Sequence, residues 1–392
     1  MALQLVHLTS EDFEEAMDFI NLVFSQKNFP HDFVRRMPMV CRPEEEYMRR
    51  HLAIKRDGRI RAMLLSNPTW VTVAGHRLRV AGIGSVATHQ NERGNGFMRQ
   101  LMEQAIREME EEGTDMSALG GQLQRYQYHG YDRCGLTYSY TLTAGNLRHC
   151  RYPLPDWRFE PIREESAGLL EAAQRLYEEQ PLHNGRGDTG DFYRFLVSRH
   201  DLPYACLDRE GRMVGYLTVD PSKMGAAELV ADSQEHMVDL MAAWIAANDL
   251  DHLVRAVHPW ERRMMQLLGG ICEGASAGPD HQYRIFRWER VVQAFMDLKA
   301  GYTPLAEGEL VLEIGDWGRL AVSVREGKPV CGPTGAAPQL TLTAFEAMRM
   351  IFGPFPADSV VPDAAGRLSR ERALLLQSWF PLPLSWWGQD NV

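Results

Sequence analysis

The chain has 392 residues, of which 45% are hydrophobic and 24% are charged. These proportions are typical of globular proteins and exclude a disordered, collagen-like or disulfide-scaffold chain. At about 150 residues per domain, the length predicts two or three domains. The 42 Lys and Arg against 52 Asp and Glu give a formal charge of -10. This balance argues against nucleic acid as a partner and favours a cationic substrate.

The cysteines, histidines and apolar runs predict a reducing compartment and neither a metal nor a membrane partner. The 6 cysteines form no C-x-x-C pair and the 13 histidines no H-E-x-x-H pattern. The N-terminal residues lack the basic start of a secretory signal. The uncharged stretch Ala373–Gln389 is interrupted by Pro381 and Pro383, which does not suit a spanning helix. A cytoplasmic protein is expected.

The first third of the chain begins with strand patterns. Residues 52–64 contain Asp57-Gly58 between two apolar runs, which predicts a hairpin. Residues 70–73 and 78–81 flank a second turn in the same way. A further apolar run ends at Thr88.

The pattern then changes to that of a helix. From Met98 to Met109, apolar residues recur at a spacing of three and four, which predicts an amphipathic helix that Gly113 ends. A small-residue strand at 116–119, a short segment around Tyr126 and a strand near 136–143 follow.

The middle third resembles the first. The hairpin predicted at 204–217 shares the turn chemistry and the Gly-Arg-apolar run of the hairpin at 52–64. A strand at 229–231 precedes a helical stripe that starts at Met237. We therefore predict a tandem copy of one domain.

The last third forms a separate α+β module. A helix is predicted at 288–298, strands at 310–314, 320–324 and 340–342, and a second helix at 344–351.

One turn in the first copy has the composition of an anion site. The segment from His89 to Gly96 joins a strand to a helix, and its two glycines permit a sharp turn with several N–H groups aimed at one point. Arg93 adds charge, so a pyrophosphate would suit the turn. The alternative is a glycine turn without a ligand. Neither G-x-G-x-x-G nor G-K-[ST] is present, which disfavours a Rossmann or P-loop site.

A second motif lies beyond the next strand. Tyr126-Gln-Tyr-His-Gly-Tyr131 gives the pattern Y-x-x-x-G-[FY]. Strand, R-x-x-G turn, helix, strand and this pattern together resemble the acetyl-CoA-binding half of the GNAT N-acetyltransferases. The resemblance implies that Tyr126 protonates the leaving thiolate of coenzyme A. It also implies these cosubstrate-binding residues: Val86, Ala87, Thr88, Arg93, Gly94, Asn95, Gly96, Phe97, Met98, Arg99, Gly121 and Gln122.

The layout of the whole chain narrows the resemblance. Met98 departs from the small residue that most GNAT turns have there, whereas the Eis (enhanced intracellular survival) acetyltransferases also have a bulky one. The resemblance to Eis implies an α+β chain of tandem GNAT domains followed by a sterol-carrier-like domain, and a homo-oligomer. The expected domains are a catalytic one at 1–145, a degenerate copy at 146–285 and the sterol-carrier-like one at 286–392.

The second copy lacks the turn. Its equivalent segment, Asp232-Ser-Gln-Glu-His236, has no glycine, and its two carboxylates would repel a pyrophosphate. One acetyl-CoA per chain is therefore expected.

The aromatic tail, 380–392, is expected to be docked rather than exposed. In Eis-type enzymes the terminal carboxylate acts as the base, and by resemblance that role falls to Val392 through water. The tail could instead only pack on the core, with His129 or Asp132 as base, and Tyr126 could be a core tyrosine.

These expectations combine in an N-acetyltransferase that acts on a primary amine of a small or polycationic acceptor, aminoglycoside-like or lysine-like. The alternative is a non-catalytic protein that senses acetyl-CoA or binds a lipid. The tripeptide Arg186-Gly-Asp188 is expected to be a loop.

Overall fold

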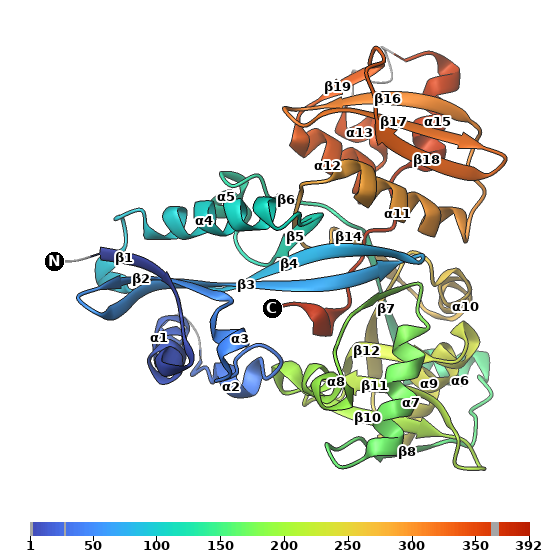
Figure 1. Ribbon diagram of the computed structural model, residues 1–392. Helices are drawn as coiled ribbons and strands as arrows, with labels where there is room; N and C mark the ends of the chain where they lie inside the picture. The colour runs from blue at the N-terminus through green and yellow to red at the C-terminus, as the bar shows by residue number, and fades with distance from the viewer. Residues whose placement is uncertain (1–2, 27–28, 362–367) are drawn as a thin grey trace.

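The computed structural model describes residues 3–26, 29–361 and 368–392. These residues form three β-sheets with helices packed against them (Figure 1). Within the described ranges, no helix combines the length and the apolar character that crossing a membrane requires.

The first sheet is built around a long hairpin. Its strand order is β1-β2-β3-β4-β5-β15-β6, and β9 pairs with β3. Its strands are β1 (Leu3–His7), β2 (His51–Arg56), β3 (Arg59–Val73), β4 (His76–Thr88), β5 (Met116–Leu119), β6 (Asp132–Arg133), β9 (Leu182–Asn184) and β15 (Gln282–Ile285). The predicted hairpin at 52–64 is confirmed as β2–β3. The runs at 70–73 and 78–81 are the far ends of β3 and β4, which continue without a break.

The predicted amphipathic helix is α4 (Phe97–Glu111). Its apolar stripe, including Leu101, Ala105 and Met109, is buried against β2, β3 and β4. On the opposite face of the sheet lie α1 (Phe13–Ser25), α2 (Phe33–Arg36) and α3 (Glu45–Met48) (Figure 1). A short helix, α5 (Leu123–Gln127), follows β5.

The second sheet has the order β14-β7-β13-β12-β11-β10-β8. Its strands are β7 (Thr137–Thr143), β8 (Arg158–Pro161), β10 (Leu202–Leu207), β11 (Met213–Val219), β12 (Gly225–Ala231), β13 (His252–Val257) and β14 (Ala275–Gly278). Its helices are α6 (Ala144–Cys150), α7 (Ala167–Glu178), α8 (Thr189–Leu196), α9 (Gln234–Ala247) and α10 (Arg262–Ile271). The predicted copy of hairpin, strand and helix is present as β10, β11, β12 and α9. A parallel pair, β12 with β13, corresponds to β4 with β5.

Sheet membership crosses the predicted domain boundaries. Strand β7, expected to close the first domain, pairs with β13 and β14 of the second sheet. In return β15, from the second segment, lies between β5 and β6 of the first sheet. The sequence assigned residues 136–143 to the first domain and residues 282–285 to the second, because an alternating pattern does not specify the partner of a strand. The exchanged strands tie the two sheets together.

The third sheet has the order β18-β17-β16-β19 and lies above the other two in Figure 1. Its strands are β16 (Gly308–Ile314), β17 (Gly318–Arg325), β18 (Lys328–Pro333) and β19 (Leu340–Leu342). Its helices are α11 (Trp288–Ala300), α12 (Ala344–Phe352), α13 (Ala357–Val360) and α15 (Arg370–Trp379). These elements confirm the predicted α+β module, and its resemblance to sterol carriers stays a prediction.

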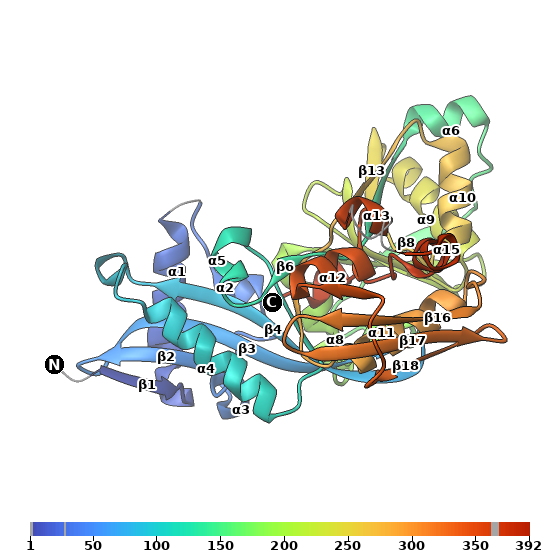
Figure 2. The same cartoon turned by 90° about the horizontal axis from the view of Figure 1, so that it is seen from above.

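The tail that follows α15 returns from the third sheet to the centre of the molecule. The C-terminus lies beside β4 in both views (Figures 1 and 2). A short 3-10 helix, η4 (Gly388–Asp390), precedes the last two residues. Trp386, Trp387 and Gln389 are buried, which confirms that the tail is docked.

Candidate active site

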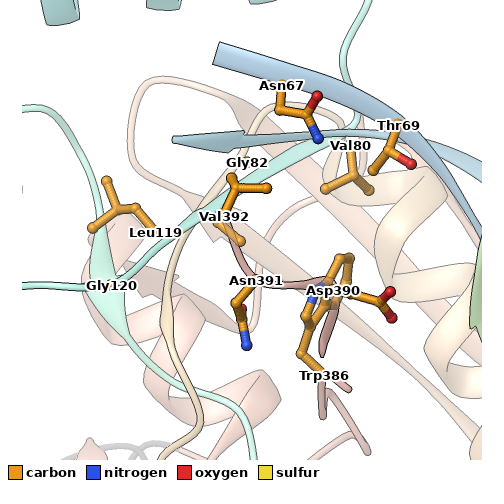
Figure 3. Close-up of a pocket in the computed structure, with 11 residues that line it drawn as sticks. Asn67, Thr69, Val80, Gly82, Leu119, Gly120, Trp386, Asp390, Asn391 and Val392 are labelled. Carbon is orange, nitrogen blue, oxygen red and sulfur yellow. The ribbon is translucent and has the colours of Figure 1, made fainter. Parts of the chain in front are cut away.

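The C-terminal residue lies directly on the strand that leads to the glycine turn. A Cβ built on Gly82 would be 2.6 Å from Cγ2 of Val392, and one on Gly84 would be 2.7 Å from its carboxyl carbon. Both glycines face the same side of β4, because side chains alternate along a strand. Figure 3 shows Val392 against Gly82 and opposite Leu119 of β5. The strand therefore has no side chains where the tail ends.

These two glycines are not among the site residues predicted from the sequence. Glycine inside a strand pattern indicates a close approach of another backbone, so the Gly-Ile-Gly run was an available signal. It could not reveal that the approaching backbone is the chain's own last residue.

A buried ion-pair network holds the tail. Arg186 donates from Nε to Asp390 at 2.7 Å and from its two terminal nitrogens to Glu228 at 3.0 and 2.6 Å. Tyr177 donates to the other oxygen of Asp390 at 2.8 Å, and Tyr216 donates to Glu228 at 2.7 Å. Burial raises the pKa of Asp390, and the adjacent Arg186 opposes that effect. The expected loop at 186–188 does join β9 to α8, but its arginine is a buried anchor.

Further bonds fix the residues on either side of Asp390. Arg199 donates to the carbonyls of Gly388 at 2.5 Å and Asn391 at 3.0 Å. Ser198 donates to the Gln389 side chain at 2.9 Å. These groups come from the second segment of the chain, so residues of that segment position the terminal residue.

A cavity of about 20 Å³ lies beside the terminal residue. Its lining includes Asn67, Thr69, Gly120 and Asp390, in addition to Val392 (Figure 3). This volume holds about one water molecule, and polar groups surround it. Within the described residues, no Lys, Arg or His nitrogen lies within 4.0 Å of the terminal carboxylate. The carboxylate is therefore not neutralised by an ion pair there.

The predicted glycine turn has the backbone of an anion site. Gly94 and Gly96 have φ of 88° and 75°, and Gly96 is the N-cap of α4 without a side-chain cap. A Cβ at either glycine would meet nothing within 4 Å, so the space in front of the turn is open. In the described part of the chain, no acceptor is found for the amides of the turn at Gly94, Gly96, Phe97, Met98 and Arg99. Free amides at a helix N-terminus fit a pyrophosphate.

The side chains of the turn have separate roles. Asn95 donates to the buried carboxylate of Glu92 at 2.9 Å, and Arg56 pairs with the same carboxylate at 3.0 Å. These two contacts fix the turn to β2. Phe97 is buried in the core, and Met98 packs against the same cluster. Arg93 and Arg99 are exposed, and Arg99 lies 3.8 Å from the Glu103 carboxylate, so Arg93 is the arginine of the turn that carries charge without an ion pair among the described residues.

Between the turn and the tail, β4 separates from β5. The two strands pair in parallel from Val80 to Ile83, and β4 then continues to Thr88 with no strand of the described chain paired to it on that side. The strand is irregular there, since Ser85 has a φ of 51°. The predicted residues Val86, Ala87 and Thr88 lie on this unpaired stretch, whose free backbone groups suit the amides of an extended arm.

Tyr126 lies on α5, which follows β5, and it belongs to the same hydrophobic cluster as Ile83 of β4 and Leu119 of β5. It is 8% exposed on α5, and a Cβ at Gly121 would be 2.8 Å from its ring. Burial raises the pKa of Tyr126, so the hydroxyl stays protonated at neutral pH. Its hydroxyl has no hydrogen-bond partner among the described residues, whereas that of the nearby core residue Tyr131 bonds Ser117 at 2.8 Å. Gln122, the N-cap of α5, is exposed beside it.

The two alternative bases differ in their surroundings. The carboxylate of Asp132 is fully buried and pairs with Arg349 of the third module at 2.6 Å. His129 is 9% exposed, and burial lowers its pKa. Asp132 therefore holds two modules together, and His129 remains as an alternative to the terminal carboxylate.

The corresponding turn of the second copy is closed by its own side chains. Ser233 caps α9 by accepting from the amide of His236 at 3.2 Å, and Asp232 bonds the His236 ring at 2.5 Å. Glu235 pairs with Arg263 at 2.8 Å. The helix N-terminus carries the two carboxylates that the sequence predicted. It is also capped, and both features oppose the binding of an anion.

Comparisons with known proteins agree with this geometry. Residues 4–140 match the family model described as acetyltransferase (GNAT) domain. No curated protein sequence matches the chain. A GCN5-related N-acetyltransferase from Kribbella flavida has 17% identity and a TM-score of 0.68, covering 100% of this chain and 98% of its own. Another from Anabaena variabilis has 16% identity and a TM-score of 0.69, covering 98% of each chain.

The Eis1 protein of Mycobacterium abscessus is similar over 100% of both chains, with 15% identity and a TM-score of 0.66. At this identity the likeness concerns the fold, and it extends through all three sheets. Residues 4–140 are thus an acetyltransferase domain of the GNAT superfamily, and the chain is an acetyl-CoA-dependent acyltransferase with an Eis-like fold.

Proposed function

We propose that the protein transfers the acetyl group of acetyl-CoA to a primary amine of a small acceptor, by direct attack within a single ternary complex. The glycine turn at 94–96 would hold the pyrophosphate, and residues 86–88 would pair with the pantetheine arm. The observation that carries the proposal is that the chain's own terminal residue lies on β4, beside the stretch of that strand that extends past its pairing with β5.

In the proposed reaction the amine nitrogen forms a bond to the thioester carbonyl carbon, and the carbon–sulfur bond breaks. The Val392 carboxylate, through the water that the small cavity accommodates, takes the proton that the amine must lose. Tyr126 donates its proton to the departing thiolate. Its raised pKa keeps that proton in place until the sulfur develops charge.

Both acceptor types predicted from the sequence, aminoglycoside-like and lysine-like, carry a suitable amine. The proposal is tested by measuring release of coenzyme A thiol with a panel of primary amines. Two variants accompany the wild type: one lacks Val392, and one has a single glycine added after it. Each moves the carboxylate from β4, and we expect at least a hundredfold loss of turnover with acetyl-CoA binding retained. Full turnover in both would exclude the terminal carboxylate as base.

A further inference from the structure

A second, larger cavity adjoins the small cavity beside Val392. It has a volume of about 300 Å³ and shares Asn67 and Thr69 of β3 with the small cavity beside Val392. It runs along β3 to Trp70 and is closed by residues before α3 and around the Gly185–Gly187 loop. Because Asn67 pairs with Gly82 and Trp70 with Arg79, the cavity extends toward the end of β4 opposite the glycine turn. A molecule whose amine lies at Val392 would place its remainder here.

Two of the four charged residues that line this cavity are already neutralised. Arg186 is bound by Glu228 and Asp390. Asp191 is paired with Arg42 at 2.7 Å and with Arg194 at 3.0 Å. The other two charged lining residues are Arg50 and Arg77. For neither does any carboxylate lie within 4.0 Å in the described part of the chain.

Arg50 is held in a fixed orientation at the inner end. Its guanidinium lies over the Tyr47 ring at 4.2 Å and donates to the Asn67 side chain at 2.8 Å. One nitrogen is used by Asn67, so the others remain to donate elsewhere. A partly buried guanidinium without a counter-ion is unfavourable unless a ligand supplies one.

Arg77 is exposed at the outer end and shares with Arg50 the contact with an aromatic ring. Its guanidinium lies over the Trp70 ring at 4.4 Å, and this ring is 40% exposed. Each arginine therefore stacks on an aromatic ring and presents a planar set of donors, the arrangement that recognises carboxylate or phosphate oxygens.

We propose that this cavity binds an oxyanion of the acceptor, so that the substrate is an amine carrying a carboxylate or phosphate a short chain away. This inference rests on the proposed function and narrows it to a lysine-like rather than a polycationic acceptor. The net charge of -10 favours cations at long range. Within the cavity, the two arginines without carboxylate partners determine which ligand charge is favoured, because charges at contact distance are screened least.

The test uses pairs of amines that differ only in the anion. Lysine is compared with cadaverine, and O-phosphoethanolamine with ethanolamine, by kcat/KM for thiol release in the full-length protein. We expect the anionic member of at least one pair to be favoured tenfold or more, and the pair that shows it identifies the oxyanion. In Arg50→Gln the ratio of kcat/KM for the anionic amine to that for its partner falls toward one, and in Arg50→Lys the ratio is partly kept. The neighbouring exposed Arg49→Gln serves as the matched control and keeps it.

Calorimetry of lysine and cadaverine with the protein and coenzyme A provides a readout that does not need turnover. Tighter binding of lysine that depends on Arg50, with no amine acetylated, would retain this inference and overturn the proposed function. Acetylation of amines with no preference for the anionic member, or with preference for a polycation such as neomycin, overturns the inference alone. A preference unchanged in Arg50→Gln also overturns it.

Discussion

Gly84 and Val392 are in contact across more than 300 positions of sequence, and a Cβ on Gly84 would lie 2.7 Å from the Val392 carboxyl carbon. Glycine at this position is therefore explained by the path of the tail rather than by the strand itself. Its φ does not lie in the left-handed range, so alanine would cause no backbone strain there.

The first prediction concerns the two glycines of β4, which contact different atoms of Val392. Gly84→Ala should displace the terminal carboxylate and lower kcat at least tenfold, and trimming the last side chain with Val392→Ala should not restore it. Gly82→Ala should also lower kcat, but Val392→Ala should rescue that variant, because its clash is with Cγ2, which alanine lacks. Steady-state kinetics of the four variants checks this, with Gly168→Ala, where a Cβ meets nothing within 4 Å, as control.

The second prediction concerns Tyr126. Tyr126→Phe should lower kcat by about 10²- to 10⁴-fold with little change in acetyl-CoA affinity, because only the proton donor is removed. Stability should be unchanged, since the hydroxyl bonds no described residue. The matched control is Tyr128→Phe, on the same turn and 90% exposed. Equal kcat in both variants would contradict the role of Tyr126.

The third prediction tests whether the second copy anchors the tail. Glu228→Gln removes a buried charge bound to Arg186, which costs about 3–5 kcal/mol in buried pairs. We expect a lower free energy of urea unfolding and faster hydrogen exchange in residues 386–392. Glu235→Gln removes the half-exposed pair with Arg263 and should cost under about 1 kcal/mol. Unaltered exchange in the tail of Glu228→Gln would show that the network is not its anchor.

The fourth prediction is a pH dependence of stability. Burial, and secondarily the charge of Arg255, lowers the pKa of His258 well below its ordinary 6.5. The unfolded chain therefore binds more protons than the folded one below pH 6.5, and stability falls as the pH falls. The loss approaches about 1.4 kcal/mol per pH unit. His258 bonds Ser385 at 2.8 Å and packs on Trp387. Protonation of His258 is therefore expected to weaken the docking of the tail.

His258→Asn should reduce the slope of unfolding free energy against pH between 6.5 and 5. Both proteins retain His51, whose pKa burial lowers to about 4, so that contribution cancels in the comparison. Parallel slopes for the two proteins would mean that His258 does not determine the acid sensitivity.

The sequence alone determined the local elements and the chemistry of one turn. The spacing of Leu101, Ala105 and Met109 specified α4, and the two glycines before it specified an open N-terminus, because these features depend on neighbouring residues. The absence of glycine between Asp232 and His236 likewise distinguished the two copies.

Only the tertiary structure decided which strands pair and where the chain ends. Strands β7 and β15 exchange sheets, and Arg186, in a tripeptide expected only as a loop, reaches Asp390 more than 200 residues away. These contacts depend on long-range packing, which a pattern of polar and apolar residues does not specify. The charge of -10 was a property of the whole chain, whereas the pairing of each arginine in the cavity is local. Among the described residues, the fold leaves Arg50 and Arg77 without carboxylate partners beside the proposed site.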